Sequence, residues 1–144
     1  MILVDANLLI YAAIPDMPQH DEARDWLDSA LNQSPRVGLP WPSLLAFMRI
    51  VTNHRLFPRP WSIEDAWRQV LSWCQAPPVW HPQATLSHRA ILERYLFEVR
   101  GGNNVPDAHL AALATEHGLV LQSADQGFAR FSGLRWENPL VAGS

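Results

Sequence analysis

The chain has 144 residues, 48% of them hydrophobic, and a formal net charge of −3 at pH 7. This length and apolar content predict one folded domain and exclude a disordered chain. The N-terminal apolar run, residues 2–14, is interrupted by Asp5 and Asn7 and has no basic segment before it. It is too short and polar for a membrane span and a poor signal peptide, so we expect a soluble, cytoplasmic protein with no membrane partner.

The first half of the chain alternates short apolar runs with helical periods. Residues 1–5 are β-rich and end in a carboxylate, which is typical of a buried parallel strand. Residues 20–32 repeat apolar side chains with a helical period, and residues 37–39 form a second short strand. A first-turn proline favours a helix over residues 42–53, and the prolines of residues 56–61 indicate a loop.

The second half continues the alternation. Ser62 and Asp65 resemble a capping box at the start of a helix, and Gly118 lies where a helix commonly ends in a C-cap glycine. The sequence predicts helices over residues 62–75, 85–99 and 106–117, a turn over 101–104, and strands over 79–80, 119–123 and 134–140.

Short strands that alternate with amphipathic helices predict an α/β fold with a mainly parallel sheet. Ligands of such sheets bind outside the carboxyl ends of the strands. Asp5 and Asp125 each follow a predicted strand at that edge, and Asp107 lies in the first turn of a predicted helix. We therefore expect the three carboxylates to lie near one another.

Clustered carboxylates repel one another unless a cation is present, and Mg²⁺ or Mn²⁺ prefers such oxygen ligands. A bound ion of this kind activates water and polarises a phosphodiester, which favours metal-assisted phosphodiester hydrolysis. Each acid also has a purely structural explanation. An aspartate after a strand commonly forms a turn, and one in the first helical turn complements the helix dipole.

The basic residues, histidines and cysteine indicate which ligands the chain could bind. All 11 basic residues are arginines, which bind phosphate with a bidentate fork, although genomic codon bias explains the absence of lysine better than a functional cause does. Arg49, Arg55, Arg59 and Arg130 are candidate RNA contacts, or else solvated surface charges. No histidine pair has zinc-ligand spacing, and Cys74 is the only cysteine, so we expect no zinc site.

Five segments along the chain contain short motifs whose order and spacing together are specific. They are Val4–Ala12, Gly38–Pro42 with Phe47–Thr52, Pro106–Ala114, Leu121–Phe128 and Phe131–Leu140. These segments resemble the PIN domains, in particular the VapC toxins of bacterial toxin–antitoxin pairs, and the resemblance runs from residue 1 to about residue 140.

The resemblance implies one three-layer α/β/α domain over residues 1–140, followed by a short tail, residues 141–144. It implies an endoribonuclease that depends on Mg²⁺ or Mn²⁺, a cognate antitoxin and a homodimer. By this resemblance, the catalytic and metal-binding residues are Asp5, Asp107 and Asp125. Asn7 and Ser123 match supporting residues of the family.

This sequence departs from the family pattern at two positions. Ala46 stands where most PIN domains have a glutamate, and Gly127 replaces the second acid of the late Asp-x-Asp-Phe pattern. Three carboxylates suffice for one Mg²⁺ ion but put a two-metal site in doubt. Asn7, Asn103 and Asn104 are candidates to contribute neutral oxygens or to orient water, so reduced metal affinity is one hypothesis.

Other functions fit the sequence less well. Haloacid dehalogenase-like hydrolases and phospho-receiver domains also place an aspartate after a strand. The former normally have a second aspartate where Asn7 stands, and both use a lysine, which this chain lacks. A catalytically degenerate PIN-like module that binds RNA or protein is the remaining alternative, and Ala46 and Gly127 favour it.

Overall fold

The computed structural model describes residues 1–33 and 35–140. The predicted tail, residues 141–144, lies outside the described residues. A five-stranded sheet with the order β3-β2-β1-β4-β5 runs through the centre, and every strand pair is parallel. The strands are β1 (Ile2–Val4), β2 (Val37–Gly38), β3 (Val79–Trp80), β4 (Val120–Gln122) and β5 (Trp136–Glu137).

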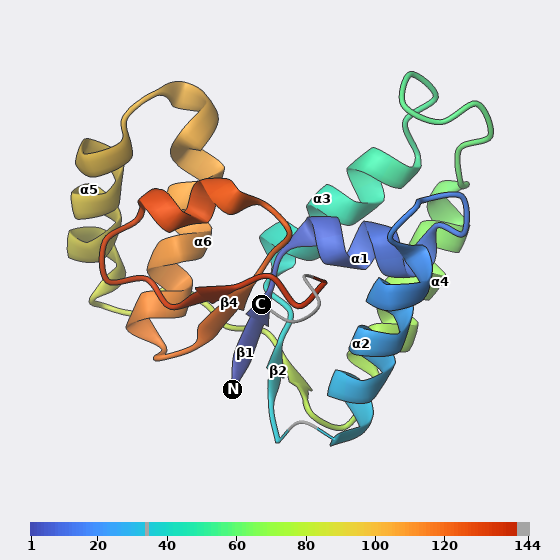
Figure 1. Cartoon of the computed structure of the whole chain (residues 1–144), viewed down its shortest axis with the longest axis horizontal. Coiled ribbons are helices and arrows are strands. Elements are labelled where there is room, and N and C mark those ends of the chain that lie inside the picture. Colours follow the sequence, from blue (N-terminus) through green and yellow to red (C-terminus); the bar gives the residue numbers. More distant parts are fainter. Residues whose placement is uncertain (34, 141–144) are drawn as a thin grey trace.

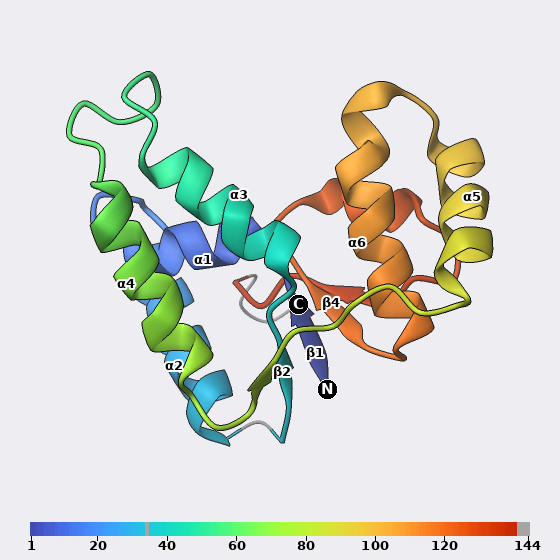
Figure 2. The same ribbon diagram turned by 180° about the vertical axis from the view of Figure 1, so that it is seen from behind.

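Helices cover both faces of the sheet, which gives three layers (Figures 1 and 2). Helices α1 to α4 lie on one side, and α5 and α6 lie on the other. Two short 3-10 helices, η1 and η2, complete the fold. Their bounds are α1 (Ala6–Ala13), α2 (His20–Gln33), α3 (Trp41–Val51), α4 (Ile63–Cys74), α5 (His88–Val99), η1 (Gly102–Asn104), α6 (Val105–Glu116) and η2 (Gln126–Arg130).

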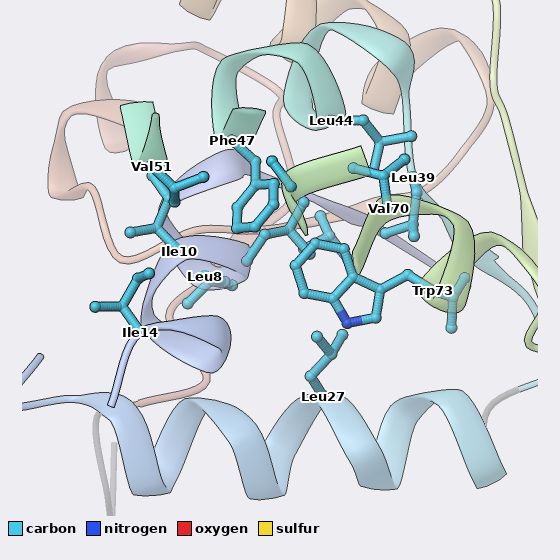
Figure 3. Packing of buried hydrophobic residues seen from close by; sticks show 14 residues of the cluster. Leu8, Ile10, Ile14, Leu27, Leu39, Leu44, Phe47, Val51, Val70 and Trp73 are labelled. Atoms are coloured by element: carbon cyan, nitrogen blue, oxygen red, sulfur yellow. The ribbon is translucent and has the colours of Figure 1, made fainter. Parts of the chain in front are cut away.

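The two helical layers bury separate apolar clusters against the sheet. Successive residues of a strand point to opposite faces, so Val4 packs among α1 to α4, while Leu3 packs against α5 and α6. The first cluster closes around Phe47, whose ring lies 4.8 Å from that of Trp73 in an edge-on contact (Figure 3). This packing fixes the strand ends from which the polar residues project.

The predicted three-layer α/β fold with a parallel sheet is confirmed, and most elements lie within three residues of their predicted bounds. Ser62 caps α4, since its Oγ accepts a hydrogen bond from the backbone N–H of Asp65 at 3.0 Å. Gly118 follows α6 with a φ of +68°, as a C-cap glycine does. The last predicted strand is shorter than expected and reduces to β5 at the sheet edge.

Two helices differ from the sequence expectation. The sequence pattern assigned no element to α1, because this eight-residue helix is apolar on nearly every side and shows no helical period. Helix α5 begins at His88 rather than at Thr85. Thr85 instead forms a turn, in which its Oγ1 accepts a hydrogen bond from the Ser87 N–H at 3.1 Å.

Within residues 1–33 and 35–140, no helix is long and apolar enough to cross a bilayer.

Candidate active site

The carboxyl ends of β1 and β4 bring Asp5 and the segment after β4 together. The Asp5 N–H donates to the Gln122 carbonyl at 3.0 Å, which continues the pairing of the two strands. Asp5 also caps α1, since its Oδ1 accepts from the Ala6 N–H at 2.7 Å. The strand pairing and the helix start together fix the position of this carboxylate.

Ser123 is the centre of the polar network at this edge. Its fully buried hydroxyl donates to Asp5 Oδ2 at 2.7 Å. The same oxygen accepts from Asn7 Nδ2 at 3.1 Å and from the Asp125 N–H at 3.0 Å. A hydroxyl has one donor and two acceptor positions, so the hydrogen-bonding capacity of Ser123 is fully used.

Asn7 ties the start of α1 to the chain after β4. Its Nδ2 bonds to Ser123, and its Oδ1 accepts from the Ala124 N–H at 3.3 Å. Both ends of the side-chain amide are therefore engaged by the protein. This arrangement fits the predicted supporting role of Asn7 better than a role as a free metal ligand.

Asp125 is the N-cap residue before η2 and is exposed. Its Oδ1 accepts from the Gly127 N–H at 2.8 Å, so one oxygen orients the following turn. No hydrogen bond to Oδ2 exists within the part of the chain that the structure describes. This oxygen is therefore open to an incoming ligand.

Burial raises the pKa of Asp5, and the charge of Asp125 adds to this effect, while hydrogen bonds from Ser123 and Ala6 oppose it. Burial also raises the pKa of Asp107, which lies in the first turn of α6. The charges of Asp5 and Asp125 raise it further, and that of Arg130 lowers it. The three predicted carboxylates are thus close enough to repel one another.

These carboxylates do not form a finished metal site. Among the described residues, no three Asp, Glu, His or Cys side chains lie close enough together to hold a metal ion without rearrangement. Their chemistry fits Mg²⁺ or Mn²⁺, because all three are oxygen ligands and their mutual repulsion is what a cation removes. Metal binding would have to draw them together.

The asparagines before α6 differ in their contacts. Asn103 is exposed in η1, and its side chain has no hydrogen bond among the described residues, so its supporting role stays a prediction. Asn104 bonds more extensively. Its Nδ2 donates to the Arg100 carbonyl at 2.6 Å, and its Oδ1 accepts from Arg130 Nη2 at 3.1 Å. The sequence placed Asn104 in the turn but gave no sign of this contact with Arg130.

The four candidate RNA-binding arginines occupy two regions. Arg49 is exposed in the last turn of α3, and Arg55 and Arg59 are exposed in the loop between α3 and α4. Arg130 ends η2, and its charge acts on Asp107. RNA contact by Arg49, Arg55 and Arg59 remains a prediction.

The two departures from the family pattern lie in α3 and η2. Ala46 is half-buried on α3, and the sequence has no acid between Asp28 and Glu64 to replace the missing glutamate. At Gly127, an added Cβ atom would lie 3.0 Å from Asp125 Oδ1. Both positions therefore leave the site with three acids.

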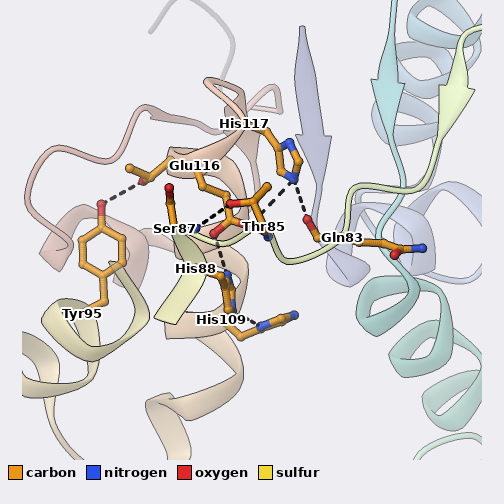
Figure 4. Close-up of polar contacts among 9 residues, drawn as sticks. Gln83, Thr85, Ser87, His88, Tyr95, His109, Glu116 and His117 are labelled. Carbon is orange, nitrogen blue, oxygen red and sulfur yellow. Dashed lines mark hydrogen bonds and ion pairs between the residues drawn. The ribbon is translucent and has the colours of Figure 1, made fainter. Parts of the chain in front are cut away.

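His109 follows Asp107 by two residues but faces α5, where it forms part of a buried polar chain (Figure 4). Its Nδ1 lies 3.0 Å from His88 Nε2, and His88 Nδ1 lies 2.7 Å from Glu116 Oε2. The Glu116 carboxylate requires a proton on His88 Nδ1, which then leaves Nε2 to accept from His109 when both rings are neutral. These contacts give His109 a role in packing α5 against α6.

Comparisons with known proteins find matches to nearly the whole length of this chain. A family model described as PIN domain matches residues 2–134. Ribonuclease VapC37 of Mycobacterium tuberculosis is 46% identical over 140 residues, which cover 96% of this chain and 97% of that relative. Ribonuclease VapC43 of the same species is 40% identical over 141 residues, which cover 97% and 96%, respectively.

Two solved structures share the fold at low sequence identity. VapBC2 from Rickettsia felis, bound to a DNA fragment from their promoter, matches with a TM-score of 0.68 and 14% identity, over 96% of this chain and 98% of that chain. FitAcB from Neisseria gonorrhoeae matches with a TM-score of 0.66 and 21% identity, again over 96% and 98%.

Proposed function

This chain belongs to the PIN domain family, and we propose that it is the ribonuclease of a toxin–antitoxin pair, which hydrolyses RNA with a divalent metal ion bound by Asp5, Asp107 and Asp125. One observation carries the proposal: the ends of β1 and β4 and the first turn of α6 bring three carboxylates to one edge of the sheet, where their charges interact. Relatives named ribonucleases that match nearly full length support the substrate class.

The residues around the carboxylates would orient them for this chemistry. Ser123 and the Ala6 N–H hold the two oxygens of Asp5, and the Gly127 N–H holds one oxygen of Asp125. Asp107 has no such fixed partner among the described residues, and burial first, then the negative charges of Asp5 and Asp125, raise its pKa. When bound, Mg²⁺ or Mn²⁺ would supply a polarised phosphodiester and a water of lowered pKa.

The partner of this chain is a cognate antitoxin protein. Solved structures with the same fold include VapBC2, bound to a DNA fragment from their promoter, and FitAcB. Assembly of this chain as a homodimer is part of the proposal, and size measurement of the purified protein, alone and with its antitoxin, tests it.

A degenerate binding module is the second candidate, because Ala46 and Gly127 remove two acids that most PIN domains have. The two functions make opposite predictions for total RNA incubated with the purified protein in Mg²⁺, in Mn²⁺ and in chelator. We expect discrete new RNA ends that require the metal and disappear in Asp107→Asn. RNA binding without metal-dependent cleavage, by a folded wild-type protein, would favour the binding module.

A further inference from the structure

Resting on the proposed function, we infer that Arg130 is a fixed phosphate-binding residue of the active site, held beside Gly127, the position at which the usual family pattern has an additional acid. The site would then combine three carboxylates with one guanidinium. The ligand is a phosphate group of the RNA backbone next to the bond that is cleaved.

Two neutral acceptors hold the guanidinium in place. Arg130 Nε donates to the Gly127 carbonyl at 2.7 Å, and Nη2 donates to Asn104 Oδ1 at 3.1 Å. The first contact lies within η2, and the second reaches across to η1 at the start of α6. An arginine fixed in this way loses little side-chain entropy when it binds a ligand.

The charge of Arg130 is held near the carboxylates without being paired to one of them. The bond to Asn104 places the guanidinium beside the start of α6, where Asp107 lies, and the bond to Gly127 keeps it beside the segment that follows Asp125. In the part of the chain that the structure describes, however, no carboxylate lies within ion-pair distance of Arg130. Two of its five N–H donors are used, and three remain for a phosphate on this exposed side chain.

The glycine at position 127 makes this arrangement possible. A Cβ atom on Gly127 would lie 3.4 Å from Arg130 Nη2 and 3.0 Å from Asp125 Oδ1. An acidic side chain there would crowd the guanidinium and pair with it, which would remove its charge from the substrate. The absence of an acid at position 127 therefore leaves the Arg130 guanidinium without a charged partner there.

The positive charge of Arg130 should affect metal binding and RNA binding in opposite directions. A cation beside the carboxylates weakens their attraction for a divalent metal ion, and the same positive charge attracts a phosphate group. Removing the positive charge should therefore tighten metal binding while it weakens RNA binding. A role in folding alone predicts neither of these opposite changes.

The test compares Arg130→Gln with Arg130→Lys and with the control Arg135→Gln. Arg135 precedes β5 and therefore lies at the amino ends of the parallel strands, whereas the site lies at their carboxyl ends. Its Nη2 donates to the Gly118 carbonyl at 2.6 Å. Both glutamine variants change the net charge equally. The measurements are Mn²⁺ affinity and the affinity for a fluorescent single-stranded RNA of mixed sequence, the latter in chelator and over a range of salt concentrations.

For Arg130→Gln, we expect about tenfold weaker RNA binding and a salt slope reduced by about 0.7. We expect Mn²⁺ affinity to rise by about twofold or more. Arg130→Lys should keep the salt slope, and Arg135→Gln should leave both affinities unchanged. An Arg130→Gln protein with unchanged RNA affinity, or with weaker Mn²⁺ binding, would overturn the inference.

The same measurements separate this inference from the proposed ribonuclease activity. If the wild type cleaves RNA and Arg130→Gln binds RNA equally well, the inference about Arg130 alone is wrong. If the wild type cleaves no RNA but Arg130→Gln shows the expected opposite changes, the inference stands and the proposed activity is wrong.

Discussion

The hydroxyl of Ser123 should be the largest single polar contribution to the stability of the site, and Ser123→Ala removes it. The hydroxyl is fully buried, donates to the Asp5 carboxylate and accepts from two N–H groups. Loss of the charge-assisted bond costs about 2 kcal/mol, and each N–H donor left without an acceptor costs about 1 kcal/mol. We therefore expect a loss of about 3 to 4 kcal/mol in the free energy of unfolding.

Urea denaturation and thermal melting measure this effect, and the corresponding drop in Tm is about 10 °C for a chain of this size. Ser132→Ala is the matched control, because the Ser132 Oγ also donates to a carboxylate, Glu98 Oε2, at 2.8 Å, but on the exposed surface. Ser132→Ala should have a much smaller effect. Equal losses for the two variants would refute the central role of Ser123.

Ser123→Ala should also change metal binding. The hydrogen bond from Ser123 lowers the pKa of Asp5, so its removal raises that pKa further. Because the metal ligand is the ionised carboxylate, Mn²⁺ binding by Ser123→Ala should require a higher pH than binding by the wild type. A binding curve with the same pH midpoint for both proteins would contradict this expectation.

Three further predictions concern stability. Asp107→Asn should raise the Tm of the metal-free protein, because it removes a half-buried charge that its neighbours repel; a lower Tm in chelator would contradict the proposed repulsion. Burial lowers the pKa of His109, so the unfolded chain takes up this proton at a higher pH than the folded chain. Stability should therefore fall as the pH drops below about 6.5, the ordinary value for histidine, and urea midpoints for His109→Gln should show a smaller pH dependence. Tyr95→Phe should cost about 1 to 2 kcal/mol in urea unfolding, since the buried Tyr95 hydroxyl bonds to Thr115 Oγ1 at 2.9 Å and to the Ser132 carbonyl at 3.1 Å; a cost near zero would show that these bonds contribute nothing.

The position of the site could be predicted because it follows from strand ends. Asp5 and Asp125 come after runs that are apolar enough to be buried strands, and neighbouring parallel strands bring their carboxyl ends to one edge. Asp107 joins them because α6 begins at the same edge. The predicted three-carboxylate site therefore depends on topology, which the alternation of strands and helices reveals.

The contacts between side chains could not be predicted in this way. The Asn104–Arg130 bond joins residues that are 26 positions apart, and the chain of Glu116, His88 and His109 depends on how α5 packs on α6. Neither has a periodic pattern in the sequence. Helix α1 was missed for the opposite reason, since its nearly uniform apolar character hides its period.

Mn²⁺ occupancy and RNA cleavage, followed in one titration of the wild-type protein and of Asp107→Asn, test the central claim most directly. Free Mn²⁺ is measured by electron paramagnetic resonance, and cleavage is measured from the same samples. If the three carboxylates hold the metal that hydrolyses RNA, the cleavage rate will rise in parallel with occupancy, and Asp107→Asn will weaken binding and abolish cleavage. Cleavage that persists in chelator, or Mn²⁺ binding that Asp107→Asn leaves unchanged, would contradict the account.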